Sequence, residues 1–170
     1  VARRDAGMSF RPATDKGFCG SYEFLSNFHP SPIEIAGVVL PTVEHAFQAI
    51  KIDLQRDVKK LYEFSKLSAS EAKRIGRAGV MRPDWEKIRV GVMANLHRLK
   101  YPPMSYLAQR LLSTGDLILE EHNYWHDDFW GIYKGAGFNW CGRTQMRVRM
   151  ELGGFEEDFG LHFFLYGDRV

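Results

Sequence analysis

The chain has 170 residues, a length typical of one domain, and its 23 Lys and Arg residues nearly balance 21 Asp and Glu residues. The net charge of +2 argues against a protein that binds nucleic acid through a broad basic field, although it allows a local basic groove. Hydrophobic residues make up 45% and charged residues 26%, which excludes disorder as the main state. Aromatic residues are frequent, at 14%, and such rings either fill a core or line a pocket for a flat ligand.

The ends of the chain differ from its middle. Residues 1–16 are polar and aperiodic, and we expect a flexible arm there, followed by one domain over residues 17–152. Residues 153–170 end in an apolar run, so this extension is expected to dock on the domain. No apolar run approaches the ~18 residues of a membrane span, and no secretory signal is visible, so we expect a cytoplasmic protein with no membrane partner.

Short strands come first in the predicted domain. Two are expected within residues 31–40, on either side of the turn signal Ala36-Gly37, where apolar residues alternate. Thr42 is a capping residue, and the apolar residues after it recur at helical spacing, which predicts a helix starting near Val43.

Helix signals dominate the rest of the chain. Ser68 and Glu71 form a capping-box pattern, and Pro83 suits the first turn of a helix that stops before Pro102. Further helices are predicted over residues 68–77, 83–101, 105–113 and 143–152, and a third strand over residues 117–120. The fold class is therefore α+β, a mainly helical single domain with a few short strands.

The predicted helix after Thr42 carries one polar face. Glu44, Gln48 and Lys51 share it, opposite the apolar stripe. A carboxylate, an amide and an ammonium group on one face can bind a polar substrate, or they can form a solvated helix surface.

Residues 120–131 combine four acids, two histidines and four aromatic residues. Such a segment is typical of a binding or catalytic surface, or of an aromatic plug beside an acidic edge. His122 and His126 are four residues apart, a spacing that directs both rings to the same side only if the segment is a helix. The residues between them argue against a helix, so no metal is expected.

Two further segments carry weaker signals. A glycine-rich loop at residues 135–142 runs into a predicted helix with several arginines, which could present backbone N–H groups to a phosphate or simply form a turn. Residues 24–30 predict a turn with a polar contact from Asn27.

These segments, in this order, resemble the NADAR family, the YbiA-like N-glycosidases, over residues 18–152. At Cys141 and Gln145 the chain departs from the family pattern, which often has Leu there, and we expect both to be packing positions. The resemblance is carried by FLSNF at 24–28, PTVEHAFQAIK at 41–51, AKRIGR at 72–77, RPDW at 82–85, VM at 92–93, STGD at 113–116, LEE at 119–121, DDFWG at 127–131, GFNWCG at 137–142 and MRVR at 146–149.

The resemblance implies hydrolysis of the C–N bond between a phosphorylated ribose and a base-like ring, without cofactor or metal. Two substrate groups follow from it: the ribosylamino-pyrimidine phosphates of riboflavin synthesis, and ADP-ribose attached to guanine, including in ADP-ribosylated DNA. A non-catalytic module that binds ADP-ribose or NAD is the alternative from another class. The oligomeric state is left open.

The resemblance also implies site residues. Glu44 is expected to act as general base or oxocarbenium stabiliser, and Asp127 to hold ribose hydroxyls or water, as two carboxylates divide the work in glycoside hydrolysis. Tryptophans would stack on the base, cations would bind phosphate, and amides would orient the substrate. The substrate-binding residues implied are Asn27, Phe28, Gln48, Lys51, Arg77, Trp85, Glu121, Trp125, Trp130, Asn139 and Arg149.

Structural roles compete with some of these assignments. Phe28, like Phe47 and Phe129, can belong to the core. His45 can satisfy a buried hydrogen bond, and Arg149 can pair with a buried acid such as Glu44.

Overall fold

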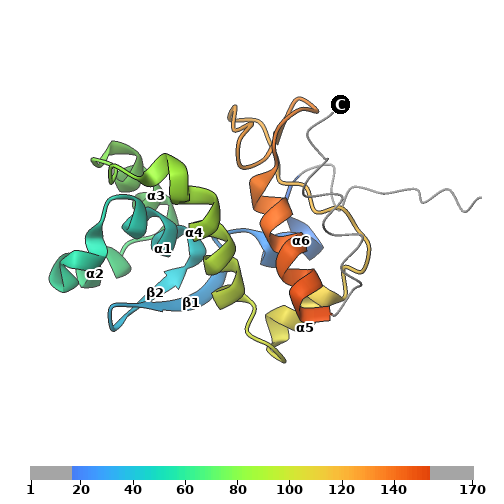
Figure 1. Ribbon diagram of the computed structural model, residues 1–170, viewed down its shortest axis with the longest axis horizontal. Coiled ribbons are helices and arrows are strands. Elements are labelled where there is room, and N and C mark those ends of the chain that lie inside the picture. The colour runs from blue at the N-terminus through green and yellow to red at the C-terminus, as the bar shows by residue number, and fades with distance from the viewer. Residues whose placement is uncertain (1–16, 154–170) are drawn as a thin grey trace, which may run out of the picture.

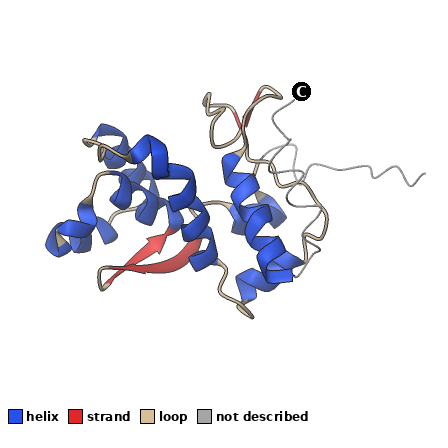
Figure 2. Cartoon of the chain, in the orientation of Figure 1, coloured by secondary structure: helices blue, strands red, loops and turns tan. Residues whose placement is uncertain are grey.

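The computed structural model describes residues 17–153, so the arm expected at 1–16 and all but the first residue of the extension expected at 153–170 lie outside the described residues. Helices predominate and the strands are short, which confirms the predicted mainly helical α+β domain (Figure 2). The elements are η1 (Gly20–Leu25), β1 (Pro30–Ile35), β2 (Val38–Thr42), α1 (Val43–Lys51), η2 (Leu54–Arg56), α2 (Val58–Ser65), α3 (Ala69–Ala78), α4 (Trp85–Lys100), α5 (Tyr106–Leu112), β3 (His122–Asn123), β4 (Ile132–Tyr133) and α6 (Trp140–Gly153).

The predicted hairpin is confirmed. β1 pairs antiparallel with β2, and Ile35 lies opposite Val38 across the turn. Ala36 and Gly37 both have positive φ, as the tight hairpin turns that match strand twist require. Ile33, Val38 and Leu40 are buried in the core, while Glu34 and Val39, which alternate with them, are exposed.

Local capping signals set several helix starts as predicted. The Thr42 hydroxyl accepts a hydrogen bond from the backbone N–H of His45 at the start of α1. Ser68 and Glu71 form the complete capping box at the start of α3. The Ser105 hydroxyl accepts a hydrogen bond from the backbone N–H of Ala108 at the start of α5. Each cap satisfies backbone N–H groups that have no partner within the helix.

Other boundaries differ from the predictions. α4 begins at Trp85, two residues after Pro83, because residues 82–84 form a turn closed by the Arg82–Asp84 ion pair. α6 begins at Trp140 rather than at residue 143. α2 was not predicted from the sequence; its N-cap is Asp57, whose side chain accepts the backbone N–H of Lys60.

The third predicted strand is wrong. Residues 117–120 form no named strand, and the short parallel pair β3 and β4 lies further along the chain. Leu119 is nevertheless fully buried, so its apolar character reports core packing and not strand pairing.

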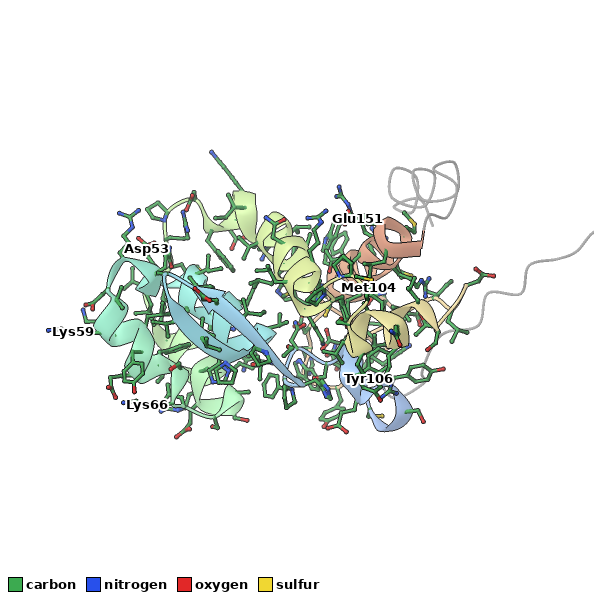
Figure 3. All side chains as sticks on the ribbon, turned by 90° about the horizontal axis from the view of Figure 1, so that it is seen from below. Asp53, Lys59, Lys66, Met104, Tyr106 and Glu151 are labelled. Atoms are coloured by element: carbon green, nitrogen blue, oxygen red, sulfur yellow. The ribbon has the colours of Figure 1, made fainter. Side chains whose placement is uncertain are left out.

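The described residues form two hydrophobic clusters. One gathers the hairpin, α1, α2, α3 and α4; the other gathers η1, α5, α6 and Leu119. Figure 1 shows the hairpin, α1, α2 and α3 on one side of α4, and α5 and α6 on the other. Figure 3 shows Asp53, Lys59 and Lys66 projecting from the surface of the first half, and Met104 and Tyr106 from the second.

A buried histidine joins the two halves. The His97 ring of α4 contacts Thr144 Oγ1 on α6 at 2.8 Å and Asn27 Oδ1 at 2.9 Å, and its side chain is fully buried. Burial is the main cause that lowers the His97 pKa well below its usual value, and the nearby Lys100 ammonium lowers it further, so the ring stays neutral.

Among the described residues, no helix is long and apolar enough to cross a membrane.

Candidate active site

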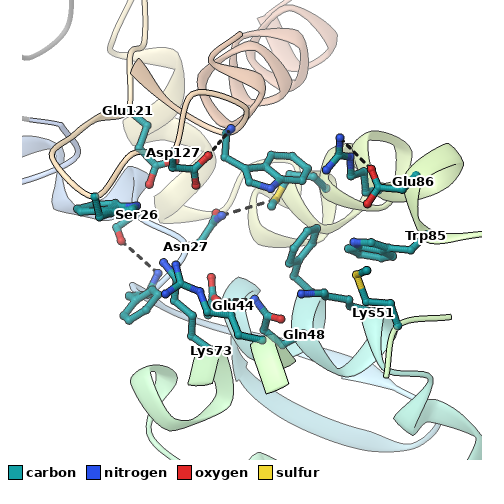
Figure 4. Close-up of a pocket in the computed structure, with 18 residues that line it drawn as sticks. Ser26, Asn27, Glu44, Gln48, Lys51, Lys73, Trp85, Glu86, Glu121 and Asp127 are labelled. Atoms are coloured by element: carbon teal, nitrogen blue, oxygen red, sulfur yellow. Dashed lines mark hydrogen bonds and ion pairs between the residues drawn. The ribbon is translucent and has the colours of Figure 1, made fainter. Parts of the chain in front are cut away.

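A cavity of about 280 Å³ opens between α1, α3, α4, the segment before β1 and the loop between β3 and β4 (Figure 4). It brings together side chains that lie up to a hundred residues apart in the sequence. The predicted site residues that line it are Asn27, Phe28, Glu44, Gln48, Lys51, Arg77, Trp85, Glu121, Trp125, Asp127 and Trp130.

Glu44 lies in the wall formed by α1. It is 6% exposed, and its Oε1 accepts a hydrogen bond from Gln48 Nε2 at 2.9 Å. Burial raises the Glu44 pKa, whereas Lys73, the Gln48 amide, Arg77 and Lys51 act to lower it. The Glu44 and Gln48 face of α1 is therefore a buried pocket wall and not a solvated surface.

The Gln48 amide nitrogen donates to Glu44, whereas the Gln48 amide oxygen accepts no hydrogen bond from the described residues. Gln48 is 6% exposed, and its Oε1 has no hydrogen-bond partner in the described part of the chain. Gly76 of α3 lies against this amide, so close that an added Cβ would fall 2.0 Å from Oε1. A buried acceptor without a partner is costly, and a donor on a bound ligand would satisfy it.

Asp127 is fixed at the opposite wall. Its Oδ1 accepts the backbone N–H of Trp130 at 2.8 Å, and its own N–H donates to Asn123 Oδ1 at 3.0 Å. Figure 4 shows the Asp127 and Glu121 carboxyl groups close together on this side. One Asp127 oxygen therefore has a structural task, and the other remains available to a ligand.

The aromatic residues of the pocket divide into two kinds. Trp85 is only 4% exposed, and Phe47 packs edge-on against both Trp85 and Trp130, at centroid distances of 4.8 and 5.1 Å. Phe28 and Trp125 are 38% and 43% exposed and line the same pocket. Phe28 is therefore a pocket residue and not core, and the accessible ring faces belong to Phe28 and Trp125.

Cations surround the pocket, and the sequence analysis assigned only some of them to it. Lys73 and Arg89 line the cavity beside Lys51 and Arg77. Lys73 Nζ lies 5.4 Å from the ring centroids of both Phe28 and Trp125. Lys73 and Arg77 are four residues apart on a predicted helix, and residues at this spacing share one helix face. This spacing is the signal that could have identified Lys73 as a neighbour of Arg77. Among the described residues, Lys51, Lys73 and Arg77 form no ion pair.

The segment before β1 is anchored from behind. The Asn27 carbonyl accepts the N–H of Glu44 at 3.0 Å, and Lys100 Nζ donates to the Ser26 carbonyl at 2.7 Å. Asn27 Nδ2 also contacts Met93 Sδ at 3.6 Å. This segment therefore presents Ser26, Asn27 and Phe28 to the pocket on a fixed backbone.

Two predicted substrate contacts, Asn139 and Arg149, do not line this pocket. Asn139 Oδ1 accepts from the Glu121 N–H at 3.1 Å, and its Nδ2 donates to the Leu119 carbonyl at 2.8 Å. Arg149 Nη1 donates to Thr114 Oγ1 at 2.7 Å and to the Leu117 carbonyl at 2.9 Å, so its hydrogen bonds do not go to Glu44. Both residues organise loops.

The glycine-rich loop uses the N–H groups that lead into α6 for hydrogen bonds within the protein. The backbone N–H groups of residues 138–141 donate to carbonyls of residues 128–131. The loop is therefore a turn that supports the pocket loop, which is the structural alternative from the sequence.

The remaining predicted structural residues have packing or hydrogen-bonding roles. His45 contacts Thr42 Oγ1 and the Leu67 carbonyl, each at 2.9 Å, which confirms a buried hydrogen bond. Cys141 and Gln145 are fully buried, as expected of packing positions. His122 binds Glu120 and His126 contacts Tyr133, and no cluster of three metal-binding side chains occurs in residues 17–153.

Fold and site together define a small α+β domain whose pocket combines buried acids, cations and exposed rings. The NADAR domain model matches residues 11–153, and the chain belongs to the NADAR family. It is 40% identical to a riboflavin biosynthesis protein of Vibrio vulnificus over 78% of this chain, and 35% identical to the chloroplastic riboflavin biosynthesis protein PYRR of Zea mays over 75%. The chain spans only 36% and 23% of the lengths of these two relatives.

Smaller relatives match over most of their length. The N-glycosidase YbiA of Escherichia coli is 35% identical, over 77% of this chain and 82% of YbiA. The solution structure of E. coli YbiA superimposes with a TM-score of 0.66 at 33% identity, covering 79% of this chain and 82% of YbiA. The YbiA-like fold expected from the sequence is confirmed.

Proposed function

We propose that the chain is an N-glycosidase that hydrolyses the C–N bond between a phosphorylated ribose and a base-like ring. The observation that carries this proposal is one pocket in which the buried Glu44 carboxyl and the fixed Asp127 carboxyl occupy different walls. Cleavage of a ribosyl C–N bond builds positive charge on the sugar and needs a water nucleophile, so a carboxylate near the sugar serves both needs.

Glu44 suits the part of general base or charge stabiliser. Its hydrogen bond to Gln48 holds the carboxyl in one orientation, and burial raises its pKa, which makes it a stronger proton acceptor. Asp127 would hold ribose hydroxyls or the attacking water with the oxygen that Trp130 does not use. Lys51 and Arg77, with Lys73, would bind the substrate phosphate.

The substrate class is tested by product analysis. Wild-type protein is incubated separately with ribosylamino-pyrimidine phosphates, ADP-ribosyl-guanosine, ADP-ribosylated DNA and NAD, and products are identified by mass spectrometry. The riboflavin biosynthesis names of two relatives support the first substrate. Release of the phosphorylated ribose, as the sugar phosphate or as ADP-ribose, together with the base-containing product supports the proposal, whereas saturable binding without product identifies a binding module.

Phe28 and Trp125 are the proposed contacts of the flat ring. Trp125→Ala is expected to raise KM by roughly tenfold or more, because base–aromatic stacking contributes ~1–3 kcal/mol. Phe28→Ala should act in the same direction, and kcat should change less than KM in both variants. Steady-state kinetics check this, with Tyr62→Ala as a control at an exposed ring on α2. An unchanged KM in both pocket variants would contradict the stacking role.

A further inference from the structure

The proposed hydrolysis needs a proton donor as well as a base. A nitrogen that leaves with the bonding electrons, such as the amino nitrogen of a ribosylamino-pyrimidine, is a poor leaving group unless it is protonated, and an ionised carboxylate can only accept hydrogen bonds. Besides Glu44 and Asp127, the pocket wall contains the carboxyl of Glu121, close to Asp127 in Figure 4. We propose that Glu121 is the general acid that protonates the leaving nitrogen of the base, an inference that rests on the proposed N-glycosidase function.

The backbone of Glu121 is held on both sides. Its N–H donates to Asn139 Oδ1 at 3.1 Å, and its carbonyl accepts the N–H of Ile132 at 2.9 Å. Gly131 packs so closely that an added Cβ would lie 2.2 Å from this carbonyl oxygen. A general acid must keep its reach constant during proton transfer, and these contacts fix the base of the side chain.

The surroundings of Glu121 favour the protonated carboxyl. The groups that face it are Asp127 from the loop between β3 and β4, Glu44 from α1, Lys73 from α3, Lys100 from α4 and Cys141 from α6. Enclosure of the carboxyl is the main cause that raises the Glu121 pKa to about 7, even though the residue as a whole is partly exposed. Asp127 and Glu44 raise it further, while the Cys141 thiol and Lys73 lower it.

Glu44 lies among more cations than Glu121. Burial is the largest cause that raises the pKa of both carboxyl groups, but Lys73, Arg77 and Lys51 all act to lower the pKa of Glu44, whereas Asp127 and Glu44 raise that of Glu121. Two carboxyl groups in one pocket with different surroundings can divide the roles of acid and base.

The proton balance of the step is complete. The C1–N bond breaks and its electron pair goes to the leaving nitrogen, which takes the proton from Glu121. Water forms the new C1–O bond and gives one proton to Glu44. The two carboxyl groups then return to their starting states by exchange with solvent, and the products are the sugar phosphate and the free base.

The test separates proton donation from folding. Glu121→Gln is expected to lower kcat about 10²–10⁴-fold on the ribosylamino-pyrimidine phosphate. On p-nitrophenyl riboside 5-phosphate, whose leaving group departs without a proton, kcat of the same variant should stay within about threefold of wild type because no general acid is needed. Equal losses on both substrates, or no loss on either, would overturn the role of Glu121.

The pH profile gives a second readout. The wild-type kcat should fall as pH rises through about 7, because Glu121 then loses the proton that it must donate. Asp127→Asn removes a negative charge that raises the Glu121 pKa. The fall of kcat on the alkaline side of the profile, the alkaline limb, should therefore move to lower pH, even though the variant is less active. A limb that does not move contradicts the assignment. Absence of turnover by the wild-type protein itself would overturn the proposed function and this inference together.

Discussion

Glu44→Gln is expected to lower kcat by about 10³-fold with little loss of folding free energy, if general-base and charge-stabilising contributions are both removed. The substitution keeps the size and shape of a side chain that is only 6% exposed. It replaces the carboxylate, whose Oε1 accepts a hydrogen bond from Gln48, with a neutral amide. The change therefore removes the one acidic side chain that α1 contributes to the pocket. The measurement is single-turnover release of base, with thermal unfolding to confirm folding.

Glu34→Gln provides the matched control for this change. Glu34 lies on β1 with an exposed side chain outside the pocket, so the same exchange should leave both kcat and the unfolding temperature unchanged. Near-normal turnover by Glu44→Gln would show that its carboxylate is not required, and a parallel loss in Glu34→Gln would point to a general charge effect.

Gly76→Ala is expected to have the second large effect. The new Cβ would lie 2.0 Å from Gln48 Oε1 and 2.8 Å from Gln48 Cβ, so α1 and α3 cannot keep their present spacing. Overpacking of this kind costs about 1–3 kcal/mol of folding free energy. Because Gln48 also orients Glu44, kcat should fall roughly tenfold or more, even at temperatures where the variant is folded.

Gly91→Ala is the control for Gly76→Ala. Gly91 also lies inside a helix, α4, but an added Cβ there meets nothing within 4 Å. Alanine has the higher helix propensity, so this variant should gain about 0.5–1 kcal/mol in the free energy of unfolding. Chemical denaturation of the two variants should therefore give shifts of opposite sign. A Gly76→Ala protein as stable and active as wild type would contradict the tight packing of α3 on Gln48.

The predictable parts of the fold are those coded by neighbouring residues. The Ala36-Gly37 turn and the Thr42 and Ser68 caps act over two to four positions, and the structure has all of them. The segment at residues 119–131 is different, because its course is set by carbonyls and side chains from other parts of the chain. Asn139 reaching Leu119 and Glu121 is one such contact, and no local pattern reveals it.

The site was predictable in part for the same reason. Helical periodicity placed Glu44, Gln48 and Lys51 on one face, and the family resemblance tied that face to the 120–131 segment. Neither could show that Trp85 would be buried against Phe47 while Phe28 stayed exposed, because that depends on packing between elements. Lys73 enters the pocket only because α3 packs beside α1.

The central claim is that this pocket hydrolyses a ribosyl C–N bond with Glu44. The most direct measurement is mass-spectrometric product analysis of a ribosylamino-pyrimidine phosphate, or of ADP-ribosyl-guanosine, incubated with the wild-type chain and with Glu44→Gln. We expect the wild type to give equal amounts of the two products, which are the sugar phosphate and the free base from the first substrate and ADP-ribose and guanosine from the second, and we expect almost no product from the variant. Intact substrate after long incubation with saturating wild-type protein, or equal product from both proteins, would contradict the central claim.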